Sequence, residues 1–130
     1  MPTDASLKIA QSFFDAMGDL PQLLSLLTDD FEWIIPGDAW PLAGTHRGQE
    51  GVKNLLQIAS EQVETNFPEP LDFIAQGDRV HAEGFATGLI KATDKRFEDH
   101  FVFAFTIRDG KVARLREYLD TQALARASAP

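Results

Sequence analysis

Apolar residues recur every three or four positions through the first part of the chain, a spacing that predicts amphipathic helices. The first helix is expected over about residues 5–17, with Gly18 as its terminator. Asp19 and Pro21 then supply an N-cap and an early proline for a short second helix that runs to Leu27. The chain is therefore expected to begin with two consecutive helices.

A short strand and a third helix are expected next. Aromatic and β-branched side chains follow one another over residues 31–35, which favours a strand. A loop over residues 37–48 separates this strand from an apolar helical stripe that extends from Val52 to Val63. The third helix should stop before Pro68, because proline disfavours the helical conformation in the residue that precedes it.

From Leu71 onward the pattern alternates between apolar and polar residues, which predicts strands. Turn signals at residues 76–78, 92–95 and 109–110 divide this half into four consecutive antiparallel strands, and a short helix is expected over residues 122–127. Helices and strands are thus segregated, as in an α+β domain. We expect a twisted antiparallel sheet that curls around the N-terminal helices into a cone with an open mouth.

Composition limits what such a domain does. The 130 residues show no change of character along the chain, so a single domain over residues 1–130 is expected. Lys and Arg number 12 against 20 Asp and Glu, and the net charge of -8 disfavours binding to nucleic acid or to anionic membranes. No apolar run approaches the roughly 20 residues of a membrane span, and the start MPTDASLK lacks the order of a secretory signal, so a cytoplasmic protein is expected.

The chain contains no cysteine, so any chemistry is left to carboxylates, histidine, tyrosine and arginine. The three histidines form no metal-binding array, and only His81 and Glu83 have a same-face spacing. Glycines around the start of the third helix lack the Gly-Lys-Ser/Thr ending of a phosphate loop. We therefore expect no metal and no cofactor.

The strongest local signal is Asp109-Gly110, which predicts a two-residue type I′ turn between two long strands. Counting outward from this turn pairs residues across the hairpin. The predicted pairs are Ile107 with Val112, Phe105 with Arg114, Phe103 with Arg116, Phe101 with Tyr118, and Asp99 with Asp120. Strand side chains alternate, so these residues share one face, although a single bulge would exchange the faces beyond it.

Asp99 opposite Asp120 is the main catalytic candidate of this face. Two directly paired carboxylates repel each other, so one of them should keep its proton to higher pH and act as a general acid. A second interpretation is that Asp120 caps the last helix while Asp99 lies in solvent at the end of the sheet. Both interpretations fit the sequence.

The same face offers ligand-binding candidates. Tyr118 can donate a hydrogen bond to a carbonyl or an oxyanion, and Arg116 can bind a carboxylate, although each also fits a surface position. Phe101 and Phe103 would form an aromatic wall. These four side chains would then surround a bound molecule.

Two tryptophans and a row of small residues add to this picture. Trp40, on a loop, is a candidate ligand contact, whereas Trp33, on a strand, fits packing as well as ligand binding. Small residues on the neighbouring strand should face Phe103, Phe101 and Asp99; they are Gly84, Ala86 and Gly88. They could leave volume for a ligand, or equally lie beneath aromatic rings or at a bend.

The order of elements, with the segments PLAGTHRGQEGVKNLL and DGKVARLREYLDT, resembles the SnoaL-like branch of the nuclear-transport-factor-2-like superfamily. This superfamily includes polyketide cyclases and ketosteroid isomerase, and the resemblance covers nearly the whole chain. It implies an aspartate acid/base near the end of the last strand, for which Asp120 is the first candidate. The aspartate and tyrosine of ketosteroid isomerase correspond to Ile35 and about Phe13 here, so steroid isomerisation by that mechanism is not expected.

Two functions are consistent with these observations. The first is an enzyme that binds a small, largely apolar or aromatic molecule in a conical pocket and performs an isomerase, cyclase or lyase step by acid/base chemistry. The alternative is a non-catalytic ligand-binding or dimerisation module of the same fold. A homodimer is expected through the outer sheet face, which should carry an apolar set: Val102, Ala104, Ala113, Leu115 and Leu119.

Overall fold

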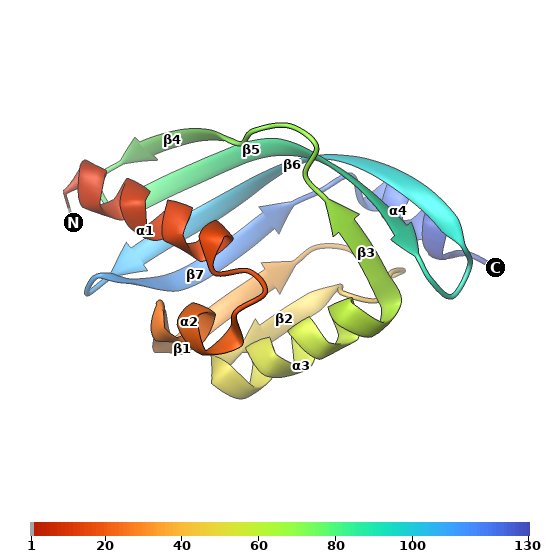
Figure 1. Cartoon of the computed structure of the whole chain (residues 1–130), viewed down its shortest axis with the longest axis horizontal. Helices are drawn as coiled ribbons and strands as arrows, with labels where there is room; N and C mark the ends of the chain where they lie inside the picture. Colours follow the sequence, from red (N-terminus) through yellow and green to blue (C-terminus); the bar gives the residue numbers. More distant parts are fainter. Residues whose placement is uncertain (1) are drawn as a thin grey trace.

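The structure is a computed structural model that describes residues 2–130. Within this range four helices pack on one curved sheet of seven strands (Figure 1). The helices are α1 (Thr3–Asp15), α2 (Leu20–Ser25), α3 (Gly48–Gln62) and α4 (Thr121–Ser128). The strands are β1 (Leu27–Ile35), β2 (Gly44–Arg47), β3 (Val63–Asn66), β4 (Asp72–Gln76), β5 (Arg79–Ile90), β6 (Lys95–Arg108) and β7 (Lys111–Tyr118). The predicted α+β class is confirmed.

The sheet has the order β2-β1-β7-β6-β5-β3, and β4 also pairs with β5. The antiparallel meander from β4 to β7 is confirmed, but β1 lies parallel to β7. Two short strands were not predicted: β2 lies in the segment expected to be a loop, and β3 occupies the expected end of the third helix. The sheet is curved, and α1 and α3 lie on its concave side (Figure 1).

Helix boundaries follow local chemistry. The predicted cap of the second helix is confirmed, because the Asp19 side chain accepts a hydrogen bond from the Gln22 amide at 3.2 Å. That helix ends at Ser25, and β1 begins already at Leu27, where a helix had been expected. The first helix begins and ends about two residues earlier than predicted.

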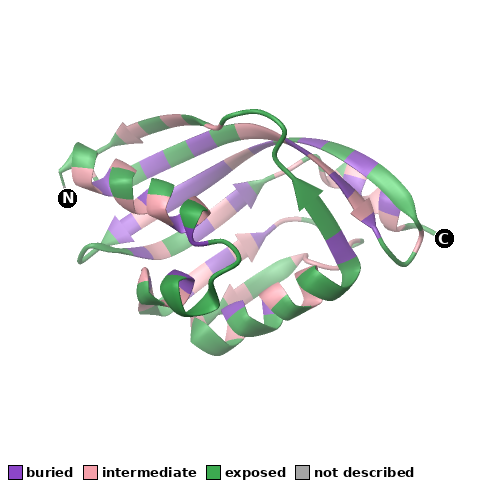
Figure 2. Ribbon diagram, in the orientation of Figure 1, coloured by how far each residue is buried: buried purple, intermediate pink, exposed green. Residues whose placement is uncertain are grey.

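The core lies between α1 and the concave side of the sheet. Phe13, fully buried on α1, places its ring 5.3 Å from the rings of both Trp33 and Phe105. A second cluster forms where α4 packs against the far end of the sheet, and it consists of Val63, Ile90, Phe97, Leu124 and Ala127. Figure 2 shows buried and exposed residues alternating along the strands, as expected for a sheet with one face on the core.

The hairpin of β6 and β7 departs from the predicted register. Its turn is of the predicted kind, since Asp109 and Gly110 both have positive φ angles, of 54° and 74°. Val112 still pairs with Ile107, but Arg114 pairs with Thr106, so Ala113 is an extra residue in β7. This bulge exchanges the faces of β7 beyond it.

The corrected pairs change which side chains point inward. Leu115 now lies opposite Phe105, and Glu117 lies opposite Phe103. The predicted partners on this face were wrong: Arg114, Arg116 and Tyr118 pair instead with Thr106, Ala104 and Val102 on the outer face. We call the face of the sheet that carries Phe101, Phe103 and Phe105 the inner face, and the opposite face the outer face.

The row of small residues on β5 is also shifted from its predicted partners. Gly84, Ala86 and Gly88 lie opposite Phe101, Asp99 and Phe97, two residues from the expected positions. A Cβ atom added at Gly84 would come within 2.6 Å of the Phe101 ring. The glycine therefore lies beneath an aromatic ring, so the ring and not a ligand occupies that volume.

Candidate functional site

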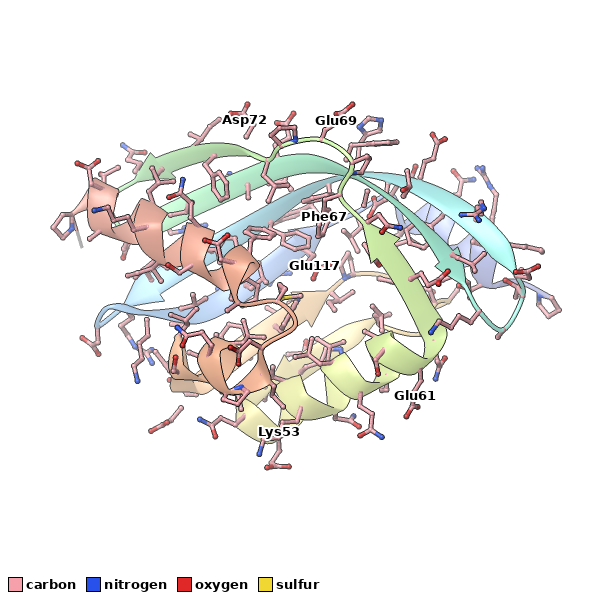
Figure 3. All side chains as sticks on the ribbon, viewed as in Figure 1. Lys53, Glu61, Phe67, Glu69, Asp72 and Glu117 are labelled. Carbon is pink, nitrogen blue, oxygen red and sulfur yellow. The ribbon has the colours of Figure 1, made fainter. Side chains whose placement is uncertain are left out.

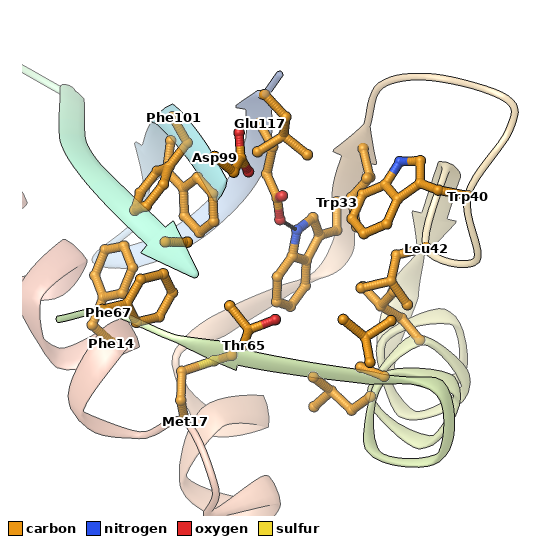
Figure 4. A pocket seen from close by; sticks show the side chains of 18 of the residues that line it. Phe14, Met17, Trp33, Trp40, Leu42, Thr65, Phe67, Asp99, Phe101 and Glu117 are labelled. Carbon is orange, nitrogen blue, oxygen red and sulfur yellow. Dashed lines mark hydrogen bonds between the residues drawn. The ribbon is translucent and has the colours of Figure 1, made fainter. Parts of the chain in front are cut away.

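An apolar cavity of about 370 Å³ lies between the inner face of the sheet and helices α1 and α3 (Figure 4). We call it the central pocket. Its wall is largely aliphatic and aromatic, and the polar side chains among its described lining residues, the two indoles aside, are Ser60, Thr65, Asp99 and Glu117. Such an apolar cavity with a few polar groups is typical of small-molecule sites.

Glu117 is the central polar group of this pocket. It lies on β7, in the molecular interior, and only 7% of its surface is exposed (Figure 3). The indole N–H of Trp33, on the neighbouring strand β1, donates to its Oε2 at 2.5 Å. Burial raises the pKa of Glu117 to about 8, and the charge of Asp99 contributes to the rise. At neutral pH the carboxyl therefore holds its proton.

Asp99 lines the same pocket from β6 and is 5% exposed. Its Oδ1 accepts a hydrogen bond from the backbone amide of Asp120 at 2.7 Å. Burial raises the pKa of Asp99, and the Asp120 carboxylate raises it further, whereas the hydrogen bond from the amide opposes the rise. Figure 4 shows the Asp99 and Glu117 carboxyls at the same end of the pocket.

The chemistry available follows from these two environments. Glu117 is a carboxylic acid with a proton to give near neutral pH, which is the property required of a general acid. A hydrogen bond to its second oxygen, from Trp33, fixes the orientation of the carboxyl. Asp99, beside it, is a buried carboxyl that can balance positive charge on a bound molecule.

The rim of the pocket is formed by two large apolar side chains. Met17, just after α1, and Phe67, just after β3, line the pocket and are each 42% exposed. The Phe67 ring lies 5.5 Å from that of Phe101 and 6.3 Å from that of Phe14. These contacts place Phe67 where a molecule entering the pocket would touch it.

Five of the predicted site residues meet at the central pocket. Trp33, Trp40, Phe101, Phe103 and Asp99 all line it. The Trp40 indole N–H donates to the Pro36 carbonyl oxygen at 3.0 Å, so this side chain offers the pocket its ring and not its N–H group. The structure thus brings together the aromatic wall and one of the two carboxyls.

Three predicted site residues lie elsewhere. Tyr118 is 56% exposed and, with Arg116, lies on the outer face, because of the bulge at Ala113. Asp120 does not pair with Asp99 through its side chain. Its carboxylate accepts a hydrogen bond from the Ala123 amide at 3.0 Å and caps α4, as the second interpretation proposed. That interpretation was wrong for Asp99, which is buried and does not lie in solvent.

Glu117 was missed because the unbulged register placed it on the outer face. The sequence carries no firm signal for it. Val112 and Leu115 are apolar, three residues apart and fully buried, but such an odd spacing also occurs where a regular strand is buried on both faces, as at Ala104 and Phe105 of β6.

Phe13 and Ile35, the positions that the resemblance placed against the tyrosine and aspartate of ketosteroid isomerase, are apolar and lie in the pocket wall. Phe13 is fully buried and Ile35 is 4% exposed, and both line the cavity. Neither supplies a polar group to the pocket. The ionisable groups come instead from β6 and β7, and the hydroxyls from Ser60 of α3 and Thr65 of β3.

Comparison with known proteins identifies the family. The model of the SnoaL-like domain matches residues 10–115. The chain belongs to the SnoaL-like family. This SnoaL-like protein also resembles an NTF2-like protein of Burkholderia xenovorans LB400, with 54% identity over 99% of each chain and a TM-score of 0.95. No protein of curated function matches it.

Two further solved structures are similar. TerC, crystallised with polyporic acid, is 27% identical over 95% of this chain and 97% of its own, with a TM-score of 0.78. A candidate polyketide cyclase from Xanthomonas campestris pv. campestris is 18% identical over 99% of this chain and 100% of its own, and its TM-score of 0.82 shows the shared fold.

Within residues 2–130, no three His, Asp or Glu side chains gather in a way that would hold a metal ion. None of the helices described here is both long and apolar enough to cross a membrane.

Proposed function

We propose that the central pocket binds a small, largely apolar molecule whose polar end lies against Glu117 and Asp99. The observation that carries this proposal is the Glu117 carboxyl buried at one end of an otherwise apolar cavity, where burial raises its pKa to about 8. A cavity of about 370 Å³ suits a molecule of two or three rings. TerC, a similar protein that was crystallised with polyporic acid, supports a small organic molecule as an occupant of this fold, without indicating its charge.

The proposed chemistry is acid catalysis. Glu117 donates its proton to the polar atom of the bound molecule, and the Asp99 carboxylate balances the positive charge that forms. Aromatic side chains exclude water, which strengthens both interactions. Protonation of a carbonyl, an imine or a leaving group in this way would begin an isomerase, cyclase or lyase step.

The binding part is tested with N-phenyl-1-naphthylamine, a neutral fluorescent molecule with three aromatic rings. We expect its fluorescence to rise on binding and a Phe101→Ala substitution to weaken the binding. Absence of binding by the folded wild-type protein would overturn the pocket assignment.

The catalytic part is tested with compounds that displace this probe. Each is incubated with the protein, and the products are followed by mass spectrometry. We expect Glu117→Gln to keep displacement and to lose turnover, with Asp120→Asn as the matched control that keeps both. If every displacing compound is recovered unchanged, the alternative applies, namely a binding module without catalysis.

We also propose a homodimer through the outer sheet face. Its contact residues differ from the set expected from the sequence. Leu115 is fully buried on the inner face, and Leu119 lines the central pocket, so neither forms part of the outer surface. The outer face keeps Val102 and gains the exposed ring of Tyr118 directly opposite it. Tyrosine is common at protein interfaces, which supports this face as the contact.

A further inference from the structure

The ionisable side chains in the wall of the central pocket are all acidic. Its ionisable lining residues are the two carboxyls Asp99 and Glu117, and no lysine, arginine or histidine is among the described side chains that line it. Both carboxyls are more than nine-tenths buried. None of the ion pairs found in residues 2–130 involves either of them. The two carboxyls of the pocket therefore have no cationic side chain against them in its wall.

We propose that the ligand of the central pocket is an apolar amine, bound as an ammonium cation against Asp99 and Glu117. This inference rests on the proposed function, because it takes the same pocket as the binding site and names the class of molecule that fills it.

The first argument is the cost of covering Asp99. The Asp120 amide donates to only one oxygen of Asp99, Oδ1. A neutral apolar molecule that covers Asp99 offers its carboxylate no partner, and a buried charge without a partner is costly. An ammonium group compensates the same charge by direct attraction. An anionic ligand would add repulsion to the same cost.

The second argument is the aromatic wall. Eight aromatic side chains line the pocket, namely Phe13, Phe14, Trp33, Trp40, Phe67, Phe97, Phe101 and Phe103. The face of an aromatic ring carries negative partial charge and attracts cations, most strongly in tryptophan. Rings combined with carboxylates and no competing cation are the combination that recognises substituted ammonium groups.

The proton balance depends on the form in which the amine arrives. A neutral tertiary amine takes the proton of Glu117, so that one N–H bond forms as one O–H bond breaks. The product is an ammonium–carboxylate pair. A quaternary ammonium ion accepts no proton, so its close contact with Glu117 favours release of the carboxyl proton to water. Its affinity should therefore rise with pH as Glu117 ionises.

Three isosteric probes test the charge preference directly. Benzyltrimethylammonium, neopentylbenzene and phenylmethanesulfonate share a benzyl group attached to a tetrahedral centre, and they carry charges of plus one, zero and minus one. Binding is followed by the NMR signal of the Trp33 indole N–H, which lies in the pocket wall. We expect the cation to bind at least about tenfold more tightly than the neutral probe, and the sulfonate to bind more weakly than both.

The control is the double variant Asp99→Asn with Glu117→Gln. It should still bind neopentylbenzene and should bind the cation no more tightly than the neutral probe. In the wild type, cation affinity should rise between pH 6.5 and 9, and Glu117→Gln should remove this rise. The charged groups near the site are Asp99, which faces Glu117, and Asp120 and His100, which act on Asp99.

The outcomes separate the two proposals. If neopentylbenzene shifts the Trp33 signal and binds as tightly as the cation, the amine inference is wrong and the binding pocket stands. If none of the three probes shifts that signal, and N-phenyl-1-naphthylamine also fails to bind, the proposed function is wrong and the amine inference falls with it.

Discussion

The indole N–H of Trp33 and the Oε2 atom of Glu117 are joined by a hydrogen bond of 2.5 Å. The two residues lie on β1 and β7, which pair in parallel although they are far apart in the sequence. Trp33 therefore binds one oxygen of the carboxyl, so that the other is left to hold the proton and meet a ligand. This contact orients the carboxyl of the central pocket.

Removing the indole donor should raise the pKa of Glu117. The Trp33 hydrogen bond favours the ionised carboxylate, so Trp33→Phe should move the pKa further above about 8. The carboxyl titration is followed by ¹³C NMR. Trp40→Phe is the matched control, since that indole donates to the Pro36 carbonyl oxygen instead. Equal shifts in both variants would contradict the role given to Trp33.

Stability should fall as pH rises through the range set by Glu117. Its pKa is about 8 in the folded protein against 4.5 for the ordinary group, so over this interval the folded state binds more protons than the unfolded state. The free energy of unfolding then decreases with pH by up to about 1.4 kcal/mol per unit. The contribution is fully present below pH 4.5 and lost above about 8. Asp99, whose pKa is also raised, adds an effect of the same sign.

Urea unfolding at pH 5 and pH 8 measures this effect in the wild type and in Glu117→Gln. The variant cannot ionise at this position, so it should lose less stability between the two pH values. Parallel losses in both proteins would show that Glu117 ionises normally when folded.

Asp120 should behave as a helix cap. Asp120→Ala removes the acceptor for the Ala123 amide and should cost about 0.5–2 kcal/mol in thermal or urea unfolding. Asp120→Asn retains a capping oxygen and should stay close to wild type. Since the Asp120 backbone amide still reaches Asp99, both variants should keep probe binding. A loss of turnover in Asp120→Asn equal to that in Glu117→Gln would instead return Asp120 to a catalytic role.

The homodimer should depend on the outer face. Tyr118→Asp places a charge opposite Val102 and should shift the mass seen by sedimentation towards that of the monomer. Asp78→Asn, an exposed change in the turn between β4 and β5, is the control and should sediment as the wild type does. A wild-type protein that is monomeric at micromolar concentration would contradict the dimer.

Much of the fold was predictable because its signals are local. The Asp109-Gly110 turn and the alternation of the long strands identified the meander, and Asp19 identified the start of α2. The short strands β2 and β3 carry little alternation of their own and form because β1 and β5 offer them partners. Pairing of that kind is a tertiary effect.

The site was harder to predict, because one extra residue determines which side chains of β7 face the pocket. Ala113 has no property that marks a bulge, yet it turns Glu117 inward and Tyr118 outward. Asp99 lies on β6, whereas the extra residue is in β7. The bulge therefore does not change the face of Asp99, and its inward position was predicted correctly.

The measurement that tests this account most directly is the carboxyl titration of Glu117. Protein labelled with ¹³C at the glutamate carboxyl carbons is followed by NMR across the pH range, and the signal that vanishes in Glu117→Gln gives the assignment. The account predicts a pKa near 8 that is lower when benzyltrimethylammonium is bound. A pKa near the ordinary value of 4.5 would contradict the buried acid on which the site depends.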